Sequence, residues 1–230
     1  MAVTVVDTPT VGEAVVASSI TFSYTTGATA TGLFVSAANG SAVKATSTVK
    51  FNGTDLTELW DLNDSQPFCA VSGYLMVNPA ITTANIVVTW AAAVDAGIAG
   101  AMSLAGIETS SVAAAHRTVY TATDAAHAVA DPTITVVDSE NGDLVIDAAA
   151  TWNATIAVGA GQTSRTEQDN IAGNNISWGA STESATGAST VMSWNSGAST
   201  YWCQGATALV ASVPPPPPVI YRRMAPTQRM

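Results

Sequence analysis

Short runs of alternating apolar and polar residues recur along the chain, and turn-forming residues separate them about every ten positions. The alternation is strictest from Ser19 to Tyr24, where Ile20, Phe22 and Tyr24 fall on one face of an extended strand. Runs of this length, rich in β-branched and aromatic residues, are typical of strands that pack one face on a core. The pattern predicts an all-β protein, and the turn spacing favours a sandwich or a barrel.

The clearest turn signal is Asn141-Gly142, which lies between the two β-branched runs of residues 134–147. An Asn-Gly pair supplies the positive φ angles that a two-residue hairpin turn requires, so the sequence predicts a hairpin here. On the second arm, apolar residues alternate with Asp143 and Asp147. This alternation predicts a half-buried strand with one face on the core and its carboxylates in water.

The same criteria predict the other elements. A second Asn-Gly pair, Asn52-Gly53, indicates a tight turn, and Pro9 places an early bent strand at a sheet edge. The apolar window 91–107 is mostly Ala and Gly and is expected to form a buried strand pair, because it is too short and too polar to span a bilayer. Residues 111–131 are rich in Ala and poorly periodic, so the sequence neither predicts nor excludes a short helix there. Further strands are expected at 33–36, 43–51, 56–60, 68–77, 86–90, 151–158, 176–178, 190–194 and 201–210.

Composition adds limits on partners and compartment. Charged residues are only 10% of the chain and the formal net charge is −10, yet three of the seven basic residues fall within the last nine positions. The rest of the chain is therefore strongly acidic, which disfavours nucleic acid as its partner. The first seven residues lack the features of a secretory signal, so we expect synthesis in the cytosol. Cys69 and Cys203 are accordingly expected to be free buried thiols, with a disulfide between them as the alternative.

The C-terminal segment differs in composition from the rest. We expect a β-sandwich body over residues 1–213, followed at 214–230 by a polyproline spacer and a basic arm. A frayed terminus and an arm that docks on another subunit both fit this segment. The candidate partner-binding residues of the arm are Pro214, Pro215, Pro216, Pro217, Pro218, Ile220, Tyr221, Arg222, Arg223 and Arg229.

Few residues indicate catalysis or metal binding. His116 and His127 are the only histidines, and neither lies in a recognised nucleophile motif. Two acidic groups offer oxygen ligands to calcium without completing an EF-hand loop, namely Asp61, Asn63 and Asp64, and Asp138, Glu140 and Asp143. We expect no metal and no cofactor. The six tryptophans fall mostly within predicted strands, where a core or interface role is commoner than sugar stacking.

Nine phrases, in their order along residues 19–210, resemble a β-sandwich module of tailed-phage and bacterial structural and surface proteins. The resemblance implies a jelly-roll-like antiparallel sandwich and a non-enzymatic role, and it carries over no catalytic residue. The proline-rich arm lies outside it. The matching phrases are Ser19-Ile-Thr-Phe-Ser-Tyr24, Gly32-Leu-Phe-Val-Ser36, Val49-Lys-Phe-Asn-Gly-Thr54, Gly73-Tyr-Leu-Met-Val-Asn-Pro79, Asn85-Ile-Val-Val-Thr89, Asn141-Gly-Asp-Leu-Val-Ile-Asp147, Gly161-Gln-Thr163, Thr190-Val-Met-Ser-Trp194 and Ala206-Thr-Ala-Leu209.

The expected function follows from this resemblance together with the arm. We expect a phage capsid decoration (cement) protein, synthesised in the host cytoplasm and carried on the virion. Its partners would be the major capsid protein or another virion protein and further copies of itself, with a trimer favoured and with neither nucleic acid nor membrane involved. The alternative is a carbohydrate-binding module of a tail fibre or cell-surface protein that uses exposed tryptophans. An enzyme dependent on His116 or His127 ranks third.

Overall fold

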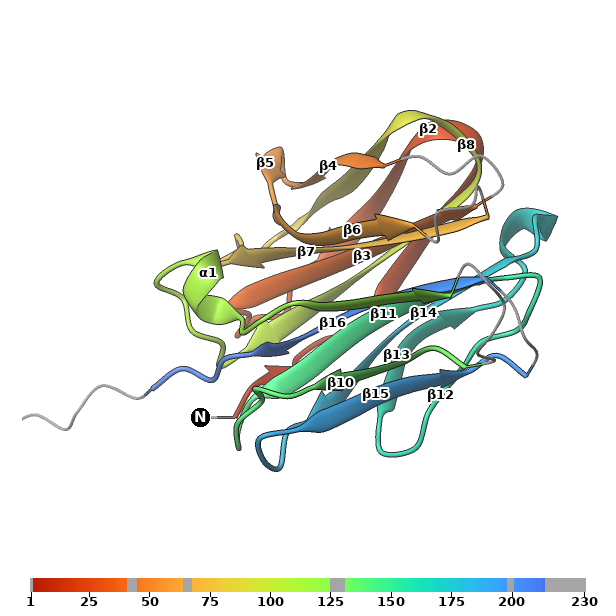
Figure 1. The fold of residues 1–230 in the computed structure, drawn as a ribbon. Helices are drawn as coiled ribbons and strands as arrows, with labels where there is room; N and C mark the ends of the chain where they lie inside the picture. Colours follow the sequence, from red (N-terminus) through yellow and green to blue (C-terminus); the bar gives the residue numbers. More distant parts are fainter. Residues whose placement is uncertain (1, 41–44, 64–67, 125–130, 198–200, 214–230) are drawn as a thin grey trace, which may run out of the picture.

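Antiparallel strands make up most of the computed structural model, which describes residues 2–40, 45–63, 68–124, 131–197 and 201–213. Strands account for 65% and helices for 3%, so the protein belongs to the predicted all-β class. Within the described residues the strands form three sheets. The two larger sheets pack face to face, and the small third sheet covers the outer side of one of them (Figure 1). This arrangement confirms the predicted antiparallel sandwich.

The N-terminal half forms the largest sheet. Its described strands are β1 (Thr4–Val5), β2 (Thr10–Thr25), β3 (Gly32–Gly40), β4 (Thr46–Phe51), β5 (Thr54–Asp55), β6 (Thr57–Asn63), β7 (Cys69–Val77) and β8 (Thr83–Ala105). The strand order is β5-β4-β8-β3-β7-β6, and β1 and β2 pair with β8. Because β2 pairs only with β8 among the described strands, it is an edge strand, as its position after Pro9 predicts.

Strand β8 corrects one expectation. Residues 91–107 were expected to form a strand pair, but residues 83–105 form one strand of 23 residues. Its first half pairs with β4 and its second half with β3, while β2 follows both halves. The small Ala and Gly side chains allow a bend instead of a turn. The bend lies where the β2 register shifts between Ala17 and Ser19, and there the two strands curve over together (Figure 1).

The C-terminal half forms the other two sheets. Its elements are α1 (Val112–Ala115), β9 (Tyr120–Asp124), β10 (Thr133–Val136), β11 (Leu144–Trp152), β12 (Ala157–Val158), β13 (Thr163–Gln168), a 3-10 helix η1 (Ile171–Gly173), β14 (Ile176–Ser184), β15 (Thr190–Asn195) and β16 (Trp202–Leu209). Of the described strands, five form the order β13-β14-β11-β16-β9 and three form β10-β15-β12. The short helix left open at 111–131 is the single turn α1.

The hairpin predicted at residues 134–147 is wrong. Strand β10 pairs with β15, whereas β11 pairs with β14 and β16, so the two arms lie in different sheets. Of the Asn141-Gly142 pair, only Gly142 has a positive φ, +99°. The Asp143 carboxylate accepts a hydrogen bond from the backbone N–H of Glu140 (3.0 Å). This wider turn carries the chain from one layer to the next.

Asp147 also departs from its prediction. It was expected in water, but its exposed fraction is 0% because β11 is a central strand covered on both faces. Leu144 and Ile146 face the core between the two larger sheets, while Val145 contributes to the core beneath the small sheet. A strand buried on both faces does not require polar residues in water at alternate positions.

Tryptophans fill much of the interior, which confirms their predicted core role. All six lie in the described part of the chain, and only Trp152 is more than 5% exposed. Glycines make room for four of the buried indoles. Trp60 lies against Gly73 and Gly205, Trp90 against Gly97, Trp178 against Gly100 and Trp194 against Gly179.

Candidate docking groove

An open groove of about 500 Å³ lies at one end of the N-terminal sheet. Two turns border it, Asn52-Gly53 between β4 and β5, and the turn that begins at Asn78 after β7. Asn52 and Gly53 have φ angles of +49° and +77°, as the predicted tight turn requires. The first residue of α1, Val112, forms another wall.

The groove exists because β6 is shorter than its neighbour β7. Pairing between them begins with Thr57 opposite Leu75. Beyond that point Met76 and Val77 pair with β3 on one side, but no described strand pairs with them on the other. The short β5 lies across this gap and pairs only with β4 among the described strands. A free strand edge at the base of a groove suits a short extended peptide.

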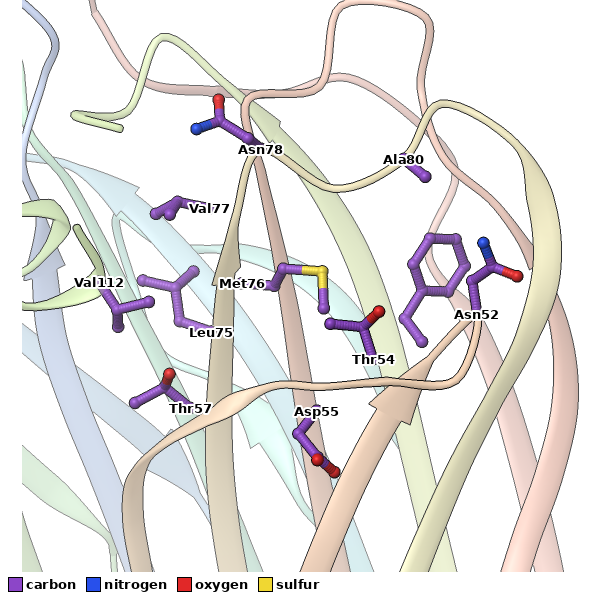
Figure 2. A pocket seen from close by; sticks show the side chains of 11 residues that line it. Asn52, Thr54, Asp55, Thr57, Leu75, Met76, Val77, Asn78, Ala80 and Val112 are labelled. Atoms are coloured by element: carbon purple, nitrogen blue, oxygen red, sulfur yellow. The ribbon is translucent and has the colours of Figure 1, made fainter. Parts of the chain in front are cut away.

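The groove has an apolar floor and a polar rim. Leu75 is buried at the floor, and Met76, Val77 and Val112 are half-buried. Figure 2 shows Met76 reaching toward Thr54, with Leu75 beside Val112. The rim consists of the exposed residues Asn52, Thr54, Asp55, Thr57 and Asn78. This combination of an apolar base and scattered hydrogen-bonding groups binds amphipathic segments rather than highly charged ligands.

Carboxylates dominate the charge near the groove. Asp55 on the rim pairs with Lys50 at 3.4 Å, and both groups are exposed. Further along β6, burial raises the pKa of Asp61 to about 6. A hydrogen bond from the Thr46 N–H lowers this pKa, and the negative charge of Glu58 raises it. Burial and the charges of Glu58 and Asp61 raise the pKa of the Tyr74 hydroxyl well above its usual value. Because Asp55 is paired with Lys50, Glu58, which follows Thr57 of the rim, is the carboxylate that favours a cationic segment beside the groove.

The described chain also ends near the groove. The Val210 N–H donates to the Ala115 carbonyl at the end of α1 (2.9 Å), and the Ser212 N–H donates to the Gly106 carbonyl (2.8 Å). These bonds hold the last described residues beside the helix whose Val112 lines the groove, and Figure 1 shows the blue C-terminal end of the described chain on the same side of the molecule as α1. All ten candidate residues of the arm, from Pro214 to Arg229, lie outside the described residues.

The acidic group around the 137–143 turn is engaged by an arginine. The Arg117 guanidinium contacts Asp143 at 2.6 Å and Glu140 at 3.0 Å, and Asp138 accepts a hydrogen bond from the Thr118 N–H (3.0 Å). Among the described residues, no cluster of three or more His, Cys, Asp and Glu side chains is arranged to hold a metal. Asp64 of the other candidate group lies outside the described residues.

Of the two histidines, the structure describes His116. His116 donates through Nδ1 to the carbonyl oxygen of Arg117 (2.6 Å), and its backbone bridges to Leu209. His127 lies outside the described residues. Backbone contacts therefore hold His116 in place.

One aromatic cluster remains partly accessible. The Phe68 ring stacks on Tyr201 with centroids 4.3 Å apart and lies 5.6 Å from the ring system of Trp152. All three side chains are half-buried. Trp152 is therefore the tryptophan with a surface open to solvent.

Comparisons with known proteins add no family. No protein-family model, curated protein or solved structure matches the chain. Within its described residues, no helix is long and apolar enough to cross a membrane.

The sequence pattern located the turn at Asn52-Gly53, which borders the groove, but not the groove itself. Its floor depends on where β6 stops relative to β7, which neither strand pattern specifies.

Proposed function

We propose that this protein is a phage virion protein that decorates the outer capsid shell and bridges and stabilises neighbouring capsid subunits. The observation that carries the proposal is the apolar groove beside the point where the described chain ends. The expected arm begins one residue beyond that point, and its sequence is complementary to the groove.

The complementarity concerns both shape and charge. Val219, Ile220 and Tyr221 form a short apolar and aromatic segment that matches the groove floor in chemistry, and arginines follow it directly. Residues 1–213 hold all 17 acidic residues and four of the seven basic ones. A basic segment is therefore drawn to the carboxylates of the body. The free edge of β7 at Met76 and Val77 offers backbone partners to an extended chain.

The occupant that we propose is the arm of a neighbouring copy. From the sequence we expect the run of five prolines to adopt the polyproline II conformation, whose rise of about 3.1 Å per residue gives a spacer of about 15 Å. A stiff spacer also lowers the entropy lost on docking. Arms exchanged around a ring give a closed homo-oligomer, with a trimer favoured, that attaches to the major capsid protein or another virion protein. Bridging stabilises the shell because the binding free energy exists only in the assembled state.

Sedimentation velocity of the full chain tests the arm exchange. The wild-type protein is expected to sediment as an oligomer, and Tyr221→Asp in the arm and Val112→Lys in the groove to sediment as monomers. Val137→Lys is the matched control, because Val137 is 60% exposed and lies outside the groove. A monomeric wild-type protein, or an oligomer that both variants leave intact, would overturn this mechanism.

The half-exposed cluster of Phe68, Trp152 and Tyr201 supports a second candidate, a carbohydrate-binding module. An aromatic face that is open to solvent can stack on a sugar ring. Glycan-array binding that Trp152→Ala abolishes, without affinity for capsids, would favour this candidate over decoration.

A further inference from the structure

The only two cysteines of the chain lie side by side in the core. Cys69 begins β7 in the N-terminal sheet, and Cys203 lies on β16 in the five-stranded sheet that faces it. They are 134 positions apart, yet their Sγ atoms are 3.7 Å apart. Both side chains are buried, with an exposed fraction of 0%, and no disulfide joins them in the structure.

The surrounding contacts hold these two segments together. Phe68, directly before Cys69, stacks on Tyr201, two positions before Cys203, with centroids 4.3 Å apart. At the end of β11 in the five-stranded sheet, the backbone N–H of Trp152 donates a hydrogen bond to the carbonyl oxygen of Tyr201 (2.9 Å). The aromatic stack therefore fixes the approach of the two sheets next to the sulfur pair. Because a disulfide has an S–S distance of about 2.05 Å, the sulfurs need to approach by about 1.7 Å.

We propose that Cys69 and Cys203 form a disulfide between the two sheets when the chain folds in the presence of a disulfide oxidant. One thiolate attacks the oxidant, for example oxidised glutathione, which gives a mixed disulfide and releases one glutathione thiol. The second cysteine then attacks the protein sulfur and releases the second glutathione thiol. Two cysteine thiols are thus oxidised and one small disulfide is reduced to two thiols, so atoms and electrons balance.

The cross-link joins opposite faces of the central core. It closes a long loop, because the two residues are 134 positions apart. The bond therefore stabilises the folded state mainly by lowering the conformational entropy of the unfolded chain. A reducing cytosol keeps the pair as thiols, and an oxidising exterior favours the bond. This inference rests on the position of the sulfurs and does not depend on the proposed function.

Refolding of the full chain in glutathione buffers tests the inference. At an oxidising ratio we expect the intact mass to fall by the two hydrogens lost, with no alkylatable thiol left after denaturation and one linked peptide pair containing Cys69 and Cys203. Loops of this size predict a rise in melting temperature of about 10 °C over the reduced protein.

Cys203→Ala is the matched variant, because alanine keeps the site apolar. It should show the reduced melting behaviour in both buffers and leave one alkylatable thiol. Two free thiols in the oxidised wild-type protein, or disulfide-linked dimers in place of the internal bond, would overturn the inference. Equal melting temperatures for the linked and reduced protein would overturn the stabilising role.

Discussion

Gly100 is a residue at which a single methyl group is expected to disturb the main core. An added Cβ would lie 2.5 Å from the Trp178 ring. That ring is fully buried, and its Nε1–H donates to the Ser36 hydroxyl (3.1 Å), so it has little freedom to move. Overpacking of this kind costs about 1–3 kcal/mol.

We therefore expect Gly100→Ala to lower the free energy of unfolding by about 2 kcal/mol in urea denaturation. Gly187→Ala is the matched control, because an added Cβ there meets no described atom within 4 Å. Its effect should stay within about 0.5 kcal/mol. Equal effects from the two substitutions would contradict this packing.

Asp147 makes stability depend on pH. Its carboxylate accepts hydrogen bonds from Ser181 Oγ (2.6 Å), Trp194 Nε1 (2.7 Å) and Gln204 Nε2 (2.8 Å). Burial outweighs these bonds and raises the pKa of Asp147 from 3.8 to about 6. The folded state thus holds the proton more tightly than the unfolded chain, so this group favours folding below pH 4 and loses that contribution as the pH rises to 6.

Asp147→Asn removes this titration. The stability of the wild-type protein relative to the variant should decline by about 2 kcal/mol between pH 4 and pH 7. Urea denaturation of both proteins across this range measures the difference, and other titrating groups cancel. A difference that stays constant with pH would show that Asp147 does not titrate in this way.

At the residue scale, the sequence predicted the core role of the tryptophans but misplaced Asp147. Large aromatic residues within strand patterns are usually buried, because their side chains carry a large apolar area. The alternation around Asp147 looked like that of a half-exposed strand, because one sequence contains no information on whether a second layer covers its other face.

Arg117 forms two ion pairs with the turn between β10 and β11. Arg117 Nε lies 2.6 Å from Asp143, whose side chain is 3% exposed, and a second nitrogen of the guanidinium lies 3.0 Å from Glu140. Asp143 also accepts a hydrogen bond from the backbone of Ala211 (3.3 Å). Arg117 thereby links the segment after α1, the turn and the end of the body.

Arg117→Ala is expected to lower the free energy of unfolding by about 2 kcal/mol, because a buried carboxylate loses its charged partner. Lys50→Ala tests the opposite case, since its pair with Asp55 is exposed and should contribute less than about 1 kcal/mol. Thermal or urea unfolding compares the two variants. A larger loss for Lys50→Ala would contradict this ranking.

At the element scale, most strands were predictable and their partners were not. The turn at Asn52-Gly53 formed as its residues require, because β4 and β5 pair directly across it. The equivalent pair at Asn141-Gly142 did not, because burying β10 against β15 and β11 in the central sheet outweighs local turn preference. Similarly, β8 continues through a window of small residues that contains no turn signal.

At the scale of the whole molecule, the described strands form three layered sheets. The sandwich class followed from turn spacing and strand composition. The third sheet and the docking groove did not, since both depend on how strands of different length align. The charge difference between an acidic body and a basic arm is visible in the sequence and becomes meaningful once the groove lies beside the end of the body.

Co-sedimentation with purified particles from the source lysate tests the proposed decoration function most directly. The full chain should pellet with particles in many copies each, and Tyr221→Asp should remain largely in the supernatant while Val137→Lys pellets like the wild type. A wild-type chain that stays soluble beside intact particles would contradict the capsid assignment.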